Sequence, residues 1–161
     1  MQEPKVSGGS AFWDDALPEV AAAKKSVFVA SLVYDNSKLQ TRLVAARARG
    51  VKVEVLLDRK SLQEGVAPKA VERLGKLKEK GVKVYLASGR SYKRVFGVEG
   101  RPGVYHAKVV VVDGVVAFVG SANQTNNSLV NGEISLRVSG AGAATEVYNQ
   151  AWAEAQRVEA Y

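Results

Sequence analysis

The chain has no cysteine and only one histidine among its 161 residues. The absence of cysteine excludes disulfide bridges and metal sites built on thiolates. No apolar run approaches the roughly 20 residues that a membrane-spanning helix needs. Any chemistry in these residues that requires an imidazole must therefore use His106, because they contain no second histidine.

The length and composition indicate one ordinary globular domain over residues 1–161. Hydrophobic residues make up 47% of the chain, which is enough to bury a core. Lysine and arginine exceed acidic residues, and the formal net charge is +7. This excess favours a polyanionic partner, either nucleic acid or an anionic lipid surface.

Apolar periodicity predicts an α/β fold. Alternating apolar residues near 27–32, 51–55 and 82–86 indicate strands, and helical spacing near 39–46, 71–77 and 148–155 indicates helices. Ser37 is the possible cap of the first helix and Pro68 would open the second, and Gly50 and Gly81 would end them. We expect a mixed sheet with helices on both faces. The stretch Ser7–Ser10 is expected to be a turn or loop.

Residues 109–119 read as a β-hairpin. The valines of Val109–Val112 precede Asp113-Gly114, and a second apolar run follows. Asp-Gly between apolar strands predicts a two-residue turn. Asp113 is therefore interpreted as a turn former and not as a group that contacts substrate.

The open ends of this hairpin would bring several polar side chains together. Residues two apart on a strand share a face, so His106 and Lys108 would point the same way. Ser121 and Asn123 would lie opposite them, beside Gly120, which has no side chain to obstruct the approach. Lysine and amide groups can stabilise phosphate charge, and a neutral imidazole can attack phosphorus. Ser121 could contact phosphate or hold its own loop.

These residues form the pattern HxKxxxxDxxxxxxGSxN, which resembles the HKD signature of the phospholipase D superfamily. The resemblance covers nearly the whole chain and implies a phospholipase D/nuclease-like domain that works through a phosphohistidine intermediate. Relatives with one motif, such as the bacterial Nuc-type endonuclease, pair two chains about a twofold axis. The resemblance therefore implies a homodimer in which His106 of one chain attacks and the partner's His106 protonates the leaving group. No cofactor or metal is implied.

Glu133 is the candidate for orienting the imidazole. It begins the strand-like segment 133–138, and in Nuc-type relatives an acidic residue in this neighbourhood bonds the other ring nitrogen of the nucleophile. An exposed strand carboxylate with no such role is the alternative.

The segment 88–105, which leads into His106, is rich in basic, aromatic and glycine residues. Basic groups can hold phosphates while an aromatic ring stacks on an unpaired base. A solvated loop whose aromatic residues cover the domain edge is the alternative. The candidate nucleic-acid-binding residues are Arg90, Tyr92, Lys93, Arg94, Phe96 and Arg101.

Three function classes remain open. The favoured one is a metal-independent endonuclease acting on DNA or RNA. The second is a phospholipase D-type hydrolase of cardiolipin or phosphatidylcholine, for which the sequence offers no evident interfacial stripe. The third is an inactive nucleic-acid-binding module.

The sequence does not determine the cellular compartment. Residues Met1–Lys5 lack the apolar core of a signal peptide. A bacterial periplasmic or secreted location would therefore require a signal peptide that has been removed, and otherwise a cytoplasmic location is expected.

Overall fold

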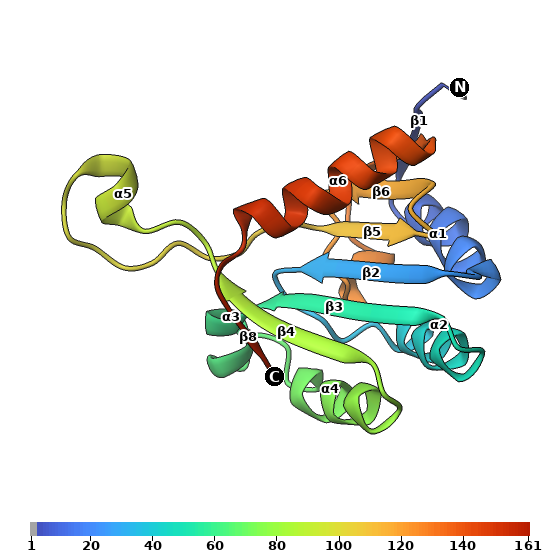
Figure 1. The fold of residues 1–161 in the computed structure, drawn as a ribbon, viewed down its shortest axis with the longest axis horizontal. Coiled ribbons are helices and arrows are strands. Elements are labelled where there is room, and N and C mark those ends of the chain that lie inside the picture. Colours follow the sequence, from blue (N-terminus) through green and yellow to red (C-terminus); the bar gives the residue numbers. More distant parts are fainter. Residues whose placement is uncertain (1–2) are drawn as a thin grey trace.

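A computed structural model describes residues 3–161, except for the side chains of Tyr92 and Phe96. The fold is an eight-stranded mixed sheet with helices on both faces (Figure 1), so the predicted α/β architecture is confirmed. The strand order is β1-β7-β6-β5-β2-β3-β4-β8. The strands are β1 (Lys5–Gly8), β2 (Ser26–Ser31), β3 (Lys52–Asp58), β4 (Lys83–Ser88), β5 (Val109–Val112), β6 (Val116–Gly120), β7 (Ile134–Ser139) and β8 (Gln156–Ala160).

Two hydrophobic clusters hold the layers together. Helices α1, α2 and α4 pack on one face of the sheet, where the core includes Trp13, Leu43 and Leu74. Helix α6 covers the other face, where Phe28 and Trp152 pack together (Figure 1). The helices are α1 (Ala11–Ala22), α2 (Ser37–Ala48), α3 (Arg59–Gln63), α4 (Ala70–Glu79), α5 (Tyr92–Phe96) and α6 (Ala141–Glu154), with a 3-10 turn at Asn127–Leu129.

Strand directions determine where the motif lies. Strands β2, β3 and β4 are parallel, whereas β5 runs antiparallel to β2, with Ala30 opposite Val109. The start of β5 is therefore beside the carboxyl ends of β2 to β4. At this end of the sheet the segment between β4 and β5 projects from the body as an arm that carries α5 (Figure 1).

Several local predictions need correction. Asn36, not Ser37, caps α2, because its side chain accepts from Leu39 N at 2.8 Å. Ser7 and Gly8 belong to strand β1 instead of a loop, and Leu32 lies beyond the end of β2. The segment 88–105, expected to be a flexible loop, contains the helix α5 and a bridge between Ser91 and Pro102.

Candidate active site

His106 and Lys108 lie together in the extended segment just before β5. Lys108 Nζ is 3.1 Å from His106 Nδ1 and 3.3 Å from Nε2, and it donates to the His106 carbonyl oxygen at 2.9 Å. His106 is exposed, whereas Lys108 is only 8% exposed. A reactive imidazole therefore faces solvent with a fixed, shielded cation beside it.

The electrostatics of this pair favour a neutral imidazole. Partial burial, and then the Lys108 ammonium, lower the pKa of His106, while the Asp58 carboxylate acts in the opposite direction. Burial also lowers the pKa of Lys108, and the Glu133 charge opposes that shift. An imidazole whose pKa is lowered keeps its lone pair at neutral pH, which nucleophilic attack requires.

Glu133 and Ser121 are hydrogen-bonded to each other, and the Glu133 charge acts on Lys108. Ser121 Oγ donates to Glu133 Oε2 at 2.5 Å and accepts from Ile134 N at 3.1 Å. A Cβ on Gly120 would collide with Ile134 O and the Ser135 side chain, so the close approach of β6 and β7 here requires glycine. Within residues 3–161 no hydrogen bond joins Glu133 to His106, and the orienting role of Glu133 stays a prediction.

Asn123 follows β6 on a loop that is fastened to the end of β2. Its Oδ1 is enclosed and has no hydrogen-bond partner among the described residues. The neighbouring Asn126 accepts from Ser37 N at 3.1 Å, and its backbone N–H donates to Asp35 Oδ1 at 2.8 Å. These bonds fasten the loop that carries Asn123 to the segment after β2.

Asp113 lies in the hairpin turn, at the far end of β5 from His106. Its carboxylate accepts hydrogen bonds from the backbone N–H groups of Lys24, Lys25 and Ser26 at 2.7 to 3.1 Å. These bonds hold the pKa of Asp113 below its ordinary value despite partial burial. The turn is longer than predicted, because Val112 pairs with Val116 and leaves Asp113–Val115 as the connection.

Asp58 was missed by the sequence analysis. This fully buried carboxylate ends β3, and its Oδ1 accepts from Tyr105 N at 2.7 Å while Oδ2 accepts from Ser61 N at 2.8 Å. It therefore fixes the backbone directly before His106 and also raises the pKa of that imidazole. The sequence shows only an aspartate at the end of a predicted strand. This pattern does not reveal that the carboxylate binds the backbone N–H of Tyr105.

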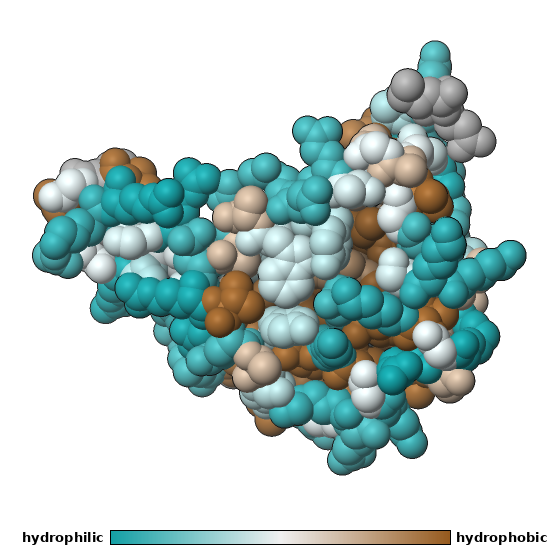
Figure 2. Space-filling model, viewed as in Figure 1, coloured by the Kyte–Doolittle hydropathy of each residue, from teal (hydrophilic) through white to brown (hydrophobic). Residues whose placement is uncertain are grey.

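The predicted basic segment forms the arm. Gly89 and Gly103 close its base through a hydrogen bond from Gly89 N to Gly103 O at 2.7 Å. Arg90 is paired with Glu154 at 2.6 Å, and these two residues line a hollow of about 310 Å³ that also contains His106. The arm surface is mostly hydrophilic, with hydrophobic atoms at its tip (Figure 2).

The other basic residues of the arm do not line the hollow that contains His106. Lys93 pairs with Glu99 at 2.6 Å, and Arg94 and Arg101 are exposed. The side chains of Tyr92 and Phe96 lie outside the described residues, so their predicted stacking stays a prediction.

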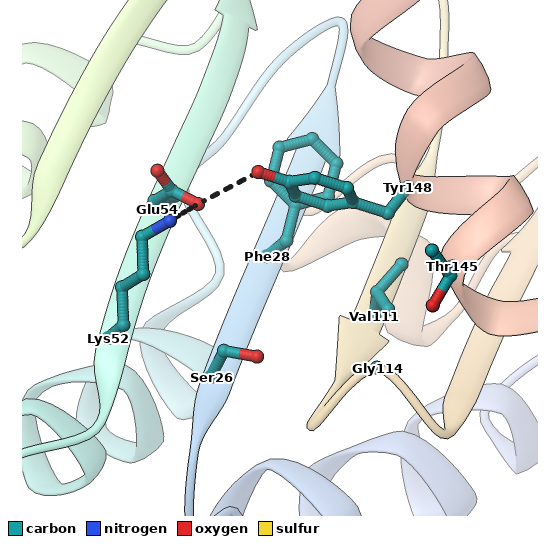
Figure 3. A pocket seen from close by; sticks show the side chains of 8 residues that line it. All are labelled: Ser26, Phe28, Lys52, Glu54, Val111, Gly114, Thr145 and Tyr148. Atoms are coloured by element: carbon teal, nitrogen blue, oxygen red, sulfur yellow. Dashed lines mark hydrogen bonds and ion pairs between the residues drawn. The ribbon is translucent and has the colours of Figure 1, made fainter. Parts of the chain in front are cut away.

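A separate cavity of about 130 Å³ lies at the amino ends of β2 and β3, beneath α6 (Figure 3). In it Tyr148 OH lies 3.3 Å from Glu54 Oε2, and Lys52 pairs with the same carboxylate at 3.0 Å. These polar groups satisfy one another, and the cavity is at the opposite end of the sheet from His106. In the described part of the chain no group of three or more His, Cys, Asp or Glu side chains could hold a metal ion, and no helix is long and apolar enough to span a membrane.

Comparison with known proteins finds a matching family model and several sequence relatives. A family model described as "Cardiolipin synthase, PLD-like domain" matches residues 17–157. The chain is 30% identical over 134 residues to the minor cardiolipin synthase ClsB of Bacillus subtilis, an alignment that covers 82% of this chain and 30% of the synthase. It also spans less than half the length of the phospholipase D relatives that it matches.

Two solved structures share the fold along almost their whole length. Nuc from Salmonella typhimurium, a phospholipase D family member, superposes with a TM-score of 0.75 at 20% identity and covers 99% of both chains. NucT from Helicobacter pylori superposes with a TM-score of 0.79 at 21% identity, over 94% of this chain and 96% of that one.

Proposed function

Because the chain belongs to the family described as cardiolipin synthase, PLD-like domain, within the phospholipase D superfamily, we propose that it is a metal-independent endonuclease that cleaves DNA or RNA through a phosphohistidine. Phosphodiesterase-type hydrolysis follows from the family, and the choice of nucleic acid is our proposal. The observation that carries it is the exposed His106 imidazole with its lowered pKa, in contact with the shielded Lys108 ammonium.

In the proposed reaction the neutral His106 attacks phosphorus, a P–N bond forms and the P–O bond to the leaving group breaks. The partner's His106 gives its proton to the departing oxygen. Water then attacks phosphorus, loses a proton to the partner's His106, and breaks the P–N bond, which returns both imidazoles to their first state. Lys108 and the amide of Asn123 stabilise the charge on the phosphoryl oxygens.

Homodimer formation is part of this proposal, because each chain supplies one imidazole and the reaction uses two. An apolar surface borders the candidate site: Val6 and Leu136 are directly opposite on β1 and β7, so they share a face with Ile134. Ile134 is 71% exposed, since its own cross-strand neighbour is Gly8. We propose that a second copy of this chain covers this surface, which would bring a second His106 to the site.

Two features support nucleic acid as the substrate. The net charge of +7 attracts a polyanion, and Arg94 and Arg101 are exposed on the arm that leads to His106. A polymer running from the site along the arm would use these charges.

The test is incubation of the purified protein with single-stranded DNA, duplex DNA and RNA in excess EDTA. Strand cleavage of at least one polymer is expected. Cleavage that appears only when a divalent metal is restored would contradict the metal-independent mechanism. Hydrolysis of none of them, with or without metal, would contradict the nuclease assignment.

A phospholipase D-type activity on cardiolipin is the second candidate, and one structural observation favours it. Val95 and Val98 near the tip of the arm are 54% and 56% exposed, beside the basic Lys93 and Arg94. Such a combination suits docking to an anionic lipid surface. Release of phosphatidic acid from cardiolipin vesicles, lost in Val95→Asp/Val98→Asp, would support this candidate. Absence of release at protein concentrations that cleave nucleic acid would exclude it.

A further inference from the structure

A second hollow lies beside the candidate active site, and four basic side chains contribute to its lining. Its volume is about 250 Å³, and it is bounded by α3, the end of β4, the returning segment of the arm and β8. These elements lie side by side at the end of the sheet from which the arm projects (Figure 1). Its lining residues are Arg59, Lys60, Gln63, Ser88, Arg101, Pro102, Gly103 and Arg157.

From this hollow we infer a second phosphate-binding subsite, which holds a backbone phosphate of the same polynucleotide strand a few nucleotides from the bond that is cleaved. This inference rests on the proposed nuclease function and adds how the enzyme selects a polymer.

One arginine of the hollow is paired with a carboxylate, whereas two others are not. Arg59 Nε pairs with Glu159 Oε1 at 2.7 Å, so Arg59 is already neutralised. Arg101 and Arg157, by contrast, have no ion-pair partner among the residues that the structure describes, and both are exposed. Two guanidinium groups that line one hollow without carboxylate partners favour an anion, and their planar forks match phosphate oxygens.

The backbone at Arg157 has an unusual conformation, where the pairing of β8 with β4 is irregular. Arg157 has φ 49°, a left-handed conformation that a residue with a Cβ rarely adopts. Arg59 Nη2 donates to the Arg157 carbonyl oxygen at 2.6 Å and holds that conformation. Sparsely populated backbone conformations concentrate at ligand-binding sites, where the surrounding structure maintains them. Arg59 is therefore a positioning residue, and Arg157 is the residue that would contact the ligand.

The hollow is close enough to His106 for one strand to reach both. Gly103 lines the basic hollow, and its partner Gly89 lines the hollow that contains His106, so the base of the arm separates the two. The chain from Gly103 to His106 spans at most about 10 Å. A single strand a few nucleotides long can therefore reach from His106 to the basic hollow.

The position of the two hollows favours a polynucleotide as the ligand. A polynucleotide carries a phosphate at every step, so one strand can fill both hollows at once. A small phosphodiester has a single phosphate and gains nothing from the second hollow. The subsite would therefore increase selectivity for polymers over small esters.

The test compares wild type with R101Q/R157Q. Substrates are a single-stranded DNA of about 15 nucleotides and bis(p-nitrophenyl) phosphate. We expect the ratio of kcat/KM for the oligonucleotide to kcat/KM for the small ester to fall about tenfold or more. The slope of log kcat/KM against log salt for the oligonucleotide should become shallower by about 0.7, because the contact with one phosphate is lost. Thermal melting checks that the variant is folded.

The matched control is K80Q/K83Q, which removes the same charge near the amino end of β4, where both lysines are exposed. An equal loss in this control, or an unchanged ratio and salt slope in R101Q/R157Q, would overturn the subsite while leaving nuclease activity standing. A wild type that hydrolyses the small ester but no polynucleotide would overturn the proposed function as well. If R101Q/R157Q loses hydrolysis of cardiolipin vesicles and not of DNA, the hollow holds a lipid headgroup phosphate, and the polynucleotide assignment is wrong.

Discussion

Lys108 Nζ lies 3.1 Å from His106 Nδ1 and 2.9 Å from the His106 carbonyl oxygen. The same ammonium thus fixes the backbone that carries the imidazole and lowers the pKa of the ring. This contact connects the local extended structure before β5 to the proposed chemistry, because a neutral, exposed imidazole next to a fixed cation is suited to attack a phosphate anion.

The titration of His106 can be measured directly, because the chain has a single histidine and each molecule gives one set of imidazole signals. We expect an NMR midpoint below the free-histidine value of about 6.5. The acidic limb of the kcat/KM profile should follow this midpoint, since the nucleophile must be neutral. In Lys108→Met the midpoint should rise, because a nearby positive charge has been removed. A wild-type midpoint at or above 6.5 would contradict the electrostatic account.

Asp113→Asn should affect stability, with catalysis largely retained. The carboxylate accepts from the backbone N–H groups of Lys24, Lys25 and Ser26, and an amide cannot reproduce these charge-assisted bonds. We expect a loss of about 1–3 kcal/mol in the free energy of unfolding at pH 7, measured by urea denaturation.

The pH dependence of this loss provides an internal control. The pKa of Asp113 is lower in the folded than in the unfolded state, so its contribution is fully present above the ordinary carboxyl pKa of 3.8. It disappears as the pH falls through the folded-state value. The difference between wild type and Asp113→Asn should therefore shrink below pH 3.8. A folded, stable and inactive Asp113→Asn would show instead that Asp113 serves the reaction.

Gly120→Ala tests the close approach of β6 and β7. A Cβ at residue 120 would lie 2.7 Å from Ser135 Cα and collide with Ile134 O. We expect a destabilisation of about 1–3 kcal/mol and reduced activity, since the strands must separate and move Ser121 away from Glu133. The matched control is Gly75→Ala in α4, where the added Cβ meets nothing within 4 Å and helix stability should increase by up to ~1 kcal/mol. Equal effects of the two substitutions would refute the steric argument.

The double substitution Ile134→Glu/Leu136→Glu should separate the proposed homodimer. Both residues are exposed on the face that also carries Val6, and buried like charges would repel across a twofold axis. Light scattering should report a monomer, and turnover should fall about 100-fold or more because the second imidazole is absent. Val71→Glu, which places the same charge on an exposed position of α4, should stay dimeric and active. A monomeric wild type with full activity would contradict the shared site.

Periodicity predicted the central elements because their burial is regular. Val27 and Val29 on β2 and Leu74 and Leu77 on α4 are buried where the apolar spacing placed them. The position of the turn was likewise predictable, because Asp113 and Gly114 both adopt positive φ, but its length of three residues was not.

The elements at the edges of the fold were harder to predict from the sequence. Helix α1 contains Pro18 in its interior, and β8 is an edge strand whose residues are mostly exposed, so neither has a clear apolar pattern. Their formation depends on tertiary pairing, in the case of β8 with β4.

The arrangement of the motif residues along one hairpin could be predicted, whereas their contacts with distant segments could not. A single stretch of sequence carries His106, Lys108, Ser121 and Glu133, so their proximity follows from one hairpin and the strand beside it. Asp58 reaches Tyr105 across 47 residues, and the basic hollow joins four separate elements. Nothing in the local sequence specifies such long-range contacts.

The most direct test of the central claim is the activity of His106→Ala on the best nucleic acid substrate of the wild type, with binding measured in parallel by fluorescence anisotropy. The account predicts that cleavage falls by about 10⁴-fold or more, while the dissociation constant for the same oligonucleotide changes little. Turnover within about tenfold of wild type would show that His106 is not the nucleophile, and the proposed mechanism would be wrong.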